Sequence, residues 1–198
     1  MNWLAHVFLS EPDVEFRLGN LLADVVKGPA RIGMSPGFLR GVQRHKAIDA
    51  FTDSHPLVRR SRARIGSEQR RFSAVLVDVF YDHFMALHWD HYSAVSLEAF
   101  TAGFYADIRN SAVELPEPAQ VMIDRIIKHD LLSGYRQVAG VEQSLRRLSM
   151  RLAARWQREF ALEKSVSDLL SDHAGFADDF ASFFPQLQAH LQGLGDTP

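Results

Sequence analysis

The chain has no cysteine among its 198 residues. This absence excludes disulfide bonds, thiolate catalysis and cysteine-based zinc sites, and it leaves histidine and carboxylate side chains as the available metal ligands. The chain also lacks an apolar run of about 18 residues, which a membrane-spanning helix requires. Its first residues, MNWLAH, carry no positive segment followed by a long apolar stretch. We therefore expect a soluble, cytoplasmic protein that does not bind membranes.

Lysine is scarce, because the 22 basic residues comprise 18 arginines and only four lysines. Arginine is the better partner for carboxylates and phosphates, since its planar group donates two parallel hydrogen bonds. The net charge of −2 argues against general binding of polyanions. One stretch is nevertheless strongly basic and is opposed only by Glu68. We call it the arginine patch, and it consists of Arg59, Arg60, Arg62, Arg64, Arg70 and Arg71.

The arginine patch has two interpretations. It is either a solvated helix surface or a docking surface for an acidic protein or a phosphate backbone. No stripe of aromatic residues accompanies it, which argues against nucleic acid as a partner. A second basic cluster follows helical spacing and either extends the same surface or forms an amphipathic exterior. Its members are Arg146, Arg147, Arg151, Arg155 and Arg158.

Patterns typical of paired strands are also missing, and nearly every segment shows the 3.6-residue period of a helix. We expect a single all-α domain over residues 1–198, built from about eight to nine helices. The predicted helices cover residues 2–9, 14–27, 37–53, 56–65, 68–91, 96–111, 117–132, 140–161 and 165–192.

Ionisable side chains interrupt the apolar helical stretches of the first 83 residues. They are His6, Asp24, His45, Asp49, Asp78, Asp82 and His83. Burying each of them without a partner would cost several kcal/mol. One divalent cation beside an oxygen substrate uses them together, so the pattern favours a metal-dependent hydrolytic site. The mixture of imidazole and carboxylate suits Mn²⁺, Fe²⁺, Mg²⁺ or Zn²⁺.

Each of these residues also has a structural alternative. A buried histidine such as His83 can bond to a carbonyl oxygen, Asp24 can pair with Lys27, and Asp49 can pair with Lys46. If all of them formed such pairs, the chain would be a helical binding protein without catalysis. Their number favours one shared cause over several independent exceptions.

Four short blocks occur in a fixed order within about the first 90 residues. They are Met1-Asn2-x-Leu4-Ala5-His6, Gly19-Asn20-Leu21-Leu22-Ala23-Asp24, His45-x-x-Ile48-Asp49-x-x-Thr52-Asp53 and Asp78-x-x-x-Asp82-His83-Phe84. In order and spacing these blocks resemble the acyl carrier protein phosphodiesterase family. The resemblance implies a fold similar to that of the all-helical HD phosphohydrolases, which bind metals through histidine and aspartate. The chain departs from the usual HD pattern, because it has Asp82-His83 where a His-Asp pair is typical.

The resemblance also implies a reaction, which is cleavage of the phosphodiester between 4′-phosphopantetheine and a serine of acyl carrier protein. The implied partner is an acidic helical protein, and the expected cofactor is Mn²⁺, with Mg²⁺ or Fe²⁺ as alternatives. The alternative enzyme is an HD-type phosphohydrolase that uses the same metal site on a nucleotide or another small phosphodiester. The oligomeric state is left open.

From the residues and the resemblance together we assign expected roles. The expected metal ligands are His6, Asp24, His45, Asp78, Asp82 and His83. Asp49 is expected to hold His45 in its tautomer. The expected catalytic residues are Asp24, Asp78, Lys46 and Asn20; of these, Asn20 and Lys46, together with Lys27, are expected to contact the phosphate or its leaving group. The arginine patch is expected to dock the carrier protein.

Overall fold

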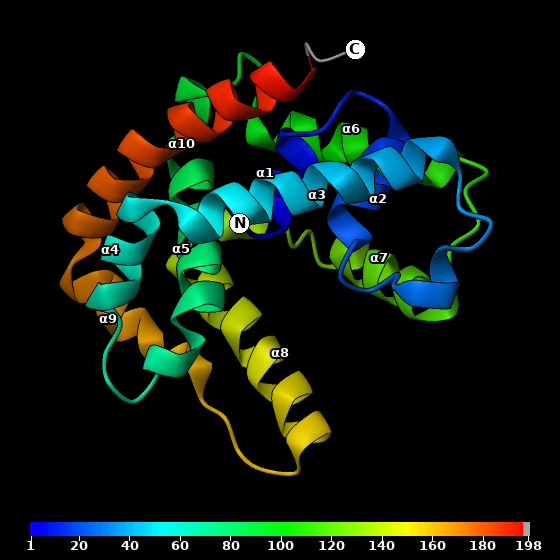
Figure 1. The fold of residues 1–198 in the computed structure, drawn as a ribbon. Helices are drawn as coiled ribbons and strands as arrows, with labels where there is room; N and C mark the ends of the chain where they lie inside the picture. Colours follow the sequence, from blue (N-terminus) through cyan, green and yellow to red (C-terminus); the bar gives the residue numbers. More distant parts are fainter. Residues whose placement is uncertain (196–198) are drawn as a thin grey trace.

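The structure is a computed structural model that describes residues 1–195, and these residues form helices and turns without a strand (Figure 1). The all-α prediction is therefore confirmed. The α-helices are α1 (Trp3–Phe8), α2 (Val14–Leu22), α3 (Pro36–Ser54), α4 (Pro56–Arg64), α5 (Ser73–Leu87), α6 (Leu97–Asn110), α7 (Glu117–Lys128), α8 (Val138–Trp156), α9 (Val166–Ser171) and α10 (His173–Gly195). Over this part of the chain, no helix has both the length and the hydropathy of a membrane span.

Helix α5 forms the centre of the core, because nearly all of its residues between Leu76 and Ala86 are buried. A helix that is apolar all round is expected in such a position. Helices α1, α4, α8 and α10 pack against it. Helix α10, drawn in orange and red in Figure 1, contributes Phe180 and Phe183, whose rings lie against Tyr81. The aspartate and histidine residues of α5, which are Asp78, Asp82 and His83, therefore lie on a helix of the buried core.

Two glycines allow α2 and α3 to pack unusually closely. A Cβ atom at Gly19 would overlap the carbonyl oxygen of Phe38, and one at Gly41 would overlap the carbonyl oxygen of Phe16. Both helices are also capped, since Asp13 accepts a hydrogen bond from the amide of Phe16 and Ser35 caps α3 in the same way. The close approach brings the backbone of α2 within reach of side chains on α3.

Helix boundaries differ from the predictions at several places, and α7 and α8 end at Lys128 and Trp156 rather than at residues 132 and 161. Helix α2 ends at Leu22 rather than at residue 27, so Asp24 lies in the turn that follows it. The predicted helix 68–91 is limited to Ser73–Leu87, with short 3₁₀ turns on both sides. The predicted helix 165–192 is two helices, α9 and α10. Asp172 separates them, and its carboxylate accepts a hydrogen bond from the amide of Gly175.

Candidate metal centre

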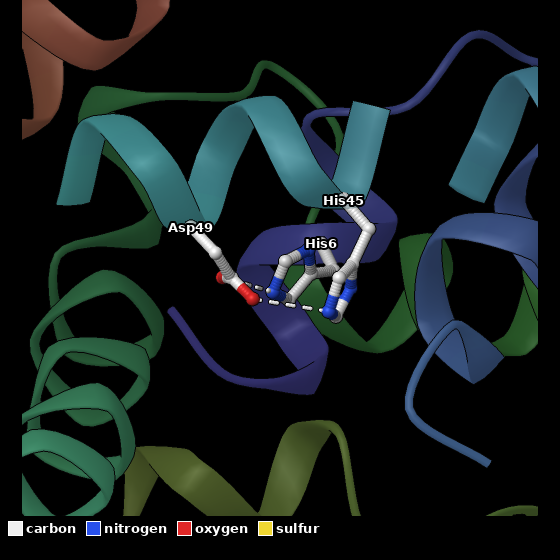
Figure 2. Close-up of side chains that lie close together, drawn as sticks. All are labelled: His6, His45 and Asp49. Atoms are coloured by element: carbon white, nitrogen blue, oxygen red, sulfur yellow. Dashed lines mark ion pairs between the residues drawn. The ribbon is translucent and has the colours of Figure 1, made fainter. Parts of the chain in front are cut away.

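Three side chains with metal-binding groups converge between α1 and α3: His6, His45 and Asp49 (Figure 2). One ligand atom from each lies within 4.8 Å of the others. His45 and Asp49 stand one turn apart on α3, and His45 Nε2 lies 3.0 Å from Asp49 Oδ2. His6 Nε2 lies 3.4 Å from Asp49 Oδ1. The two imidazole rings are stacked with their centroids 4.2 Å apart. A His-His-Asp group of this size could hold a metal ion.

Asn20 of α2 orients both imidazole rings. His6 Nδ1 donates to the side-chain Oδ1 of Asn20 at 2.8 Å, and His45 Nδ1 donates to the main-chain oxygen of Asn20 at 2.8 Å. The Asn20 amide nitrogen donates to the carbonyl oxygen of His6 at 2.7 Å and to Ser10 Oγ at 2.8 Å. These two bonds determine which end of the amide faces the His6 ring. Each imidazole thus directs its Nε2 toward Asp49, as a metal-ligating histidine would.

The surroundings of His6 Nε2 fit a cation. Burial lowers the pKa of His6, so its imidazole is neutral near pH 7. Because its Nδ1 carries the proton given to Asn20, its Nε2 presents a lone pair. That lone pair faces two oxygen acceptors, the main-chain oxygen of Met1 at 3.1 Å and Asp49 Oδ1 at 3.4 Å. A positive ion among these three atoms would satisfy all of them.

The electrostatics of His45 lead to the same conclusion. Burial lowers the pKa of His45, but hydrogen bonds to Asp24 and Asp49 outweigh this effect and raise it to about 9. The hydrogen bond with His45 holds the pKa of Asp24 well below its usual range. Burial raises the pKa of Asp49, but its bonds with His45 and His6 lower it far more. Two ionised carboxylates thus hold a proton on His45, and a metal ion would displace that proton.

Two further carboxylates border this group. Asp24 Oδ2 lies 3.6 Å from His45 Nε2, and its side chain is 72% exposed, so it stands on the open side of the centre. Asp24 also pairs with Lys27 at 2.8 Å. Asp78 projects from α5, and its Oδ1 lies 3.0 Å from the α-amine of Met1, which is 3.6 Å from Asp49 Oδ1. Asp78 Oδ1 is buried, and this amine is its ion-pair partner.

Asp82 and His83 make contacts elsewhere. The Asp82 carboxylate accepts hydrogen bonds from the amides of Leu4 and Ala5 at 2.7 and 3.3 Å, which caps α1. Burial raises the pKa of Asp82 to about 7. His83 Nδ1 donates to the carbonyl oxygen of Tyr135 at 2.8 Å. Asp82 therefore holds the N-terminus of α1, the helix that carries His6. The Nδ1 atom of His83 points toward Tyr135.

Lys46, Asn20 and Asp49 also differ from the roles expected for them. Lys46 is exposed on α3 and forms no ion pair within residues 1–195. Asn20 is fully buried, and its side chain is occupied by His6 and Ser10, so it orients ligands rather than meeting a phosphate. Asp49, expected only to hold His45, belongs to the ligand group itself. The sequence analysis missed the orienting role of Asn20, although a polar residue followed by Leu21 and Leu22 was a signal for it.

The arginine patch is largely occupied by contacts within the chain. Arg60 and Arg64 pair with Asp179, which is fully buried and also accepts a hydrogen bond from Ser61. Other contacts are those of Arg62 with Asp53, of Arg59 with the carbonyl oxygen of Ser54, and of Arg71 with the rings of Phe72 and Phe160. Docking of a carrier protein on this patch stays a prediction; within residues 1–195, Arg59, Arg70 and Arg71 have no acidic partner.

Comparisons with known proteins agree on one family. The family model described as acyl carrier protein phosphodiesterase matches residues 1–187. Among curated proteins, acyl carrier protein phosphodiesterase of Photorhabdus laumondii is 31% identical over 188 residues, covering 94% of this chain and 93% of that protein. The proteins of the same name from Serratia proteamaculans and Salmonella dublin are also 31% identical. The first covers 94% of this chain and 95% of its own length, and the second covers 96% of both. No solved structure matches the chain.

Proposed function

Because the chain belongs to the acyl carrier protein phosphodiesterase family, we propose that the group of His6, His45 and Asp49 is where it cleaves its phosphodiester. Enzymes of this family remove the phosphopantetheine group from acyl carrier protein, and the chain is accordingly a phosphodiester hydrolase. The observation that carries the assignment to this site is the shared orientation of two imidazoles. Asn20 turns both Nε2 atoms toward the same carboxylate.

The reaction is a hydrolysis at phosphorus. Water attacks the phosphorus atom, and the bond between phosphorus and the serine oxygen of the carrier protein breaks. The serine oxygen takes a proton, so the products are apo carrier protein and 4′-phosphopantetheine. The site must therefore bind an anionic phosphodiester, activate water and stabilise the charge that develops on the leaving oxygen.

A divalent cation, expected to be Mn²⁺, would be held by His6, His45, Asp49 and the exposed Asp24. When bound there, it supplies Lewis-acid activation of water and of the phosphoryl oxygens. The chain contributes the rest. Asn20 keeps both imidazoles oriented, and Asp78 adds negative charge beside the α-amine of Met1. Lys27, paired with Asp24 on the open side, is placed to meet the phosphate.

The test is to incubate the purified protein with holo acyl carrier protein, with and without Mn²⁺, and to weigh the carrier by intact mass spectrometry. We expect loss of the phosphopantetheine mass only with metal, and no loss with the Asp24→Ala or Asp78→Ala variants. The matched control is Asp90→Ala, which removes an exposed carboxylate outside the site. Wild-type rates for both site variants at saturating metal would overturn the site assignment.

A further inference from the structure

A cavity of about 200 Å³ lies between α1, the turn after α2, α7 and α8. Its walls are mainly apolar, which is typical of sites that take up a small organic ligand. The apolar side chains that line it include Trp3, Val25, Val121, Met122, Ile126 and Leu131. None of the residues considered so far as metal ligands lines this cavity.

Three arginines line the same cavity: Arg125 from α7, and Arg147 and Arg151 from α8. Within residues 1–195 none of them has an ion pair or a side-chain hydrogen bond, whereas Arg146 on the same helix pairs with Glu142. Burial lowers the pKa of Arg147, and the positive charge of Arg125 acts in the same direction. Three like charges held together without an acid repel one another, and they indicate a binding site for an anion.

Two wall residues of the cavity are close in sequence to residues of the metal centre. Trp3 precedes His6 by one turn on α1, and residues three apart on a helix lie on the same face. Val25 directly follows Asp24, the exposed carboxylate beside His45. A phosphate bound between the cavity and the metal centre could therefore contact both the cavity arginines and the metal centre, with the rest of the ligand inside the cavity.

We propose that this cavity binds the phosphopantetheine arm of the carrier protein. Its apolar walls would pack against the dimethyl and methylene groups of the arm, and the three arginines would bind the negative charge of its phosphate end. A folded carrier protein cannot enter a space of about 200 Å³, whereas part of an extended arm can. This inference rests on the proposed function, because it takes the arm from the substrate of that reaction.

Calorimetric titration tests the inference without turnover. The full chain is titrated with 4′-phosphopantetheine, with pantetheine and with inorganic phosphate, in the presence and absence of Mn²⁺. We expect phosphopantetheine to bind more tightly than either fragment, also without metal. The variants Arg147→Gln and Arg151→Gln should each weaken its binding about tenfold and leave pantetheine binding unchanged. Val121→Trp, which fills the cavity from an exposed position, should weaken binding of both.

The matched control is Arg155→Gln, which removes an arginine from α8 one turn beyond Arg151 and outside the cavity. It should bind phosphopantetheine as the wild type does. Wild-type affinity in all three cavity variants would overturn the inference, even if the carrier protein is hydrolysed with Mn²⁺. If instead the arginine-dependent binding is found but no carrier protein is hydrolysed, the proposed function fails and the binding site stands.

Discussion

Substitution of Asn20 by leucine tests how the site is held together. The side chain of Asn20 makes three buried hydrogen bonds, two with His6 and one with Ser10. Leucine has a similar size but makes none of them. At about 1 kcal/mol for each bond, and with a further cost for the buried Nδ1 of His6 left unpaired, we expect a loss of about 3 to 5 kcal/mol in the free energy of unfolding; the carbonyl oxygen of His6 keeps its bond from Ser10 Oγ. Urea denaturation measures this loss.

The same substitution affects the two imidazoles differently. Asn20 holds His45 through its main-chain oxygen, which leucine retains, and holds His6 through its side chain, which leucine lacks. We expect affinity for Mn²⁺ to fall about 10- to 100-fold, as for other residues that orient metal ligands. The control is Ser10→Ala, which removes the bond from Asn20 and the bond from Ser10 Oγ to the carbonyl oxygen of His6 but leaves the Asn20–His6 bonds; it should cost about 1 to 2 kcal/mol with metal affinity kept. Wild-type metal affinity in a folded Asn20→Leu protein would refute this account of the site.

Three further predictions concern packing and charge. Gly41→Ala should destabilise the protein by about 1 to 3 kcal/mol and weaken metal binding, because it separates α2 from α3, whereas Gly103→Ala, in open space, should not. In the metal-free protein His45, raised from 6.5 to about 9, should contribute about 3 kcal/mol of stability below pH 6.5. This contribution is lost as the pH rises through 9, and unfolding of His45→Gln across this range should show no such loss. Asp179→Ala should cost about 2 to 3 kcal/mol in thermal or urea unfolding, because Arg60 loses its carboxylate partner, Ser61 loses one hydrogen bond and Arg64 keeps only Asp172.

The helical fold could be predicted from the sequence because its signals are local. Apolar periodicity placed every long helix, and Pro36 and Pro56 mark the starts of α3 and α4. The interruption at Asp172 was missed, since its cap depends on one side-chain bond to Gly175 inside an otherwise periodic stretch. The close approach of α2 and α3 was missed as well, because a glycine does not reveal from sequence which backbone lies against it.

The site was predictable in part. Histidine and aspartate at apolar positions selected seven residues, and the structure brings three of them, His6, His45 and Asp49, into one group, although Asp49 was expected only to hold His45. The same signal also selected Asp82, because a buried carboxylate that caps a helix has the same sequence pattern as one that binds a metal. Charge density alone selected the arginine patch, although Asp179, which pairs with Arg60 and Arg64, lies more than 100 residues away in the sequence. Long-range pairing of this kind is not visible in a local pattern.

The central claim is that phosphodiester cleavage depends on a cation held by His6, His45 and Asp49. The most direct test is to titrate the metal-free protein with Mn²⁺ and to measure, in the same samples, bound metal and the rate of phosphopantetheine release from holo acyl carrier protein. We expect bound metal and the rate of release to rise together, and both to be lost in His45→Ala. Full activity in the presence of a chelator, or in a folded His45→Ala protein without bound metal, would contradict it.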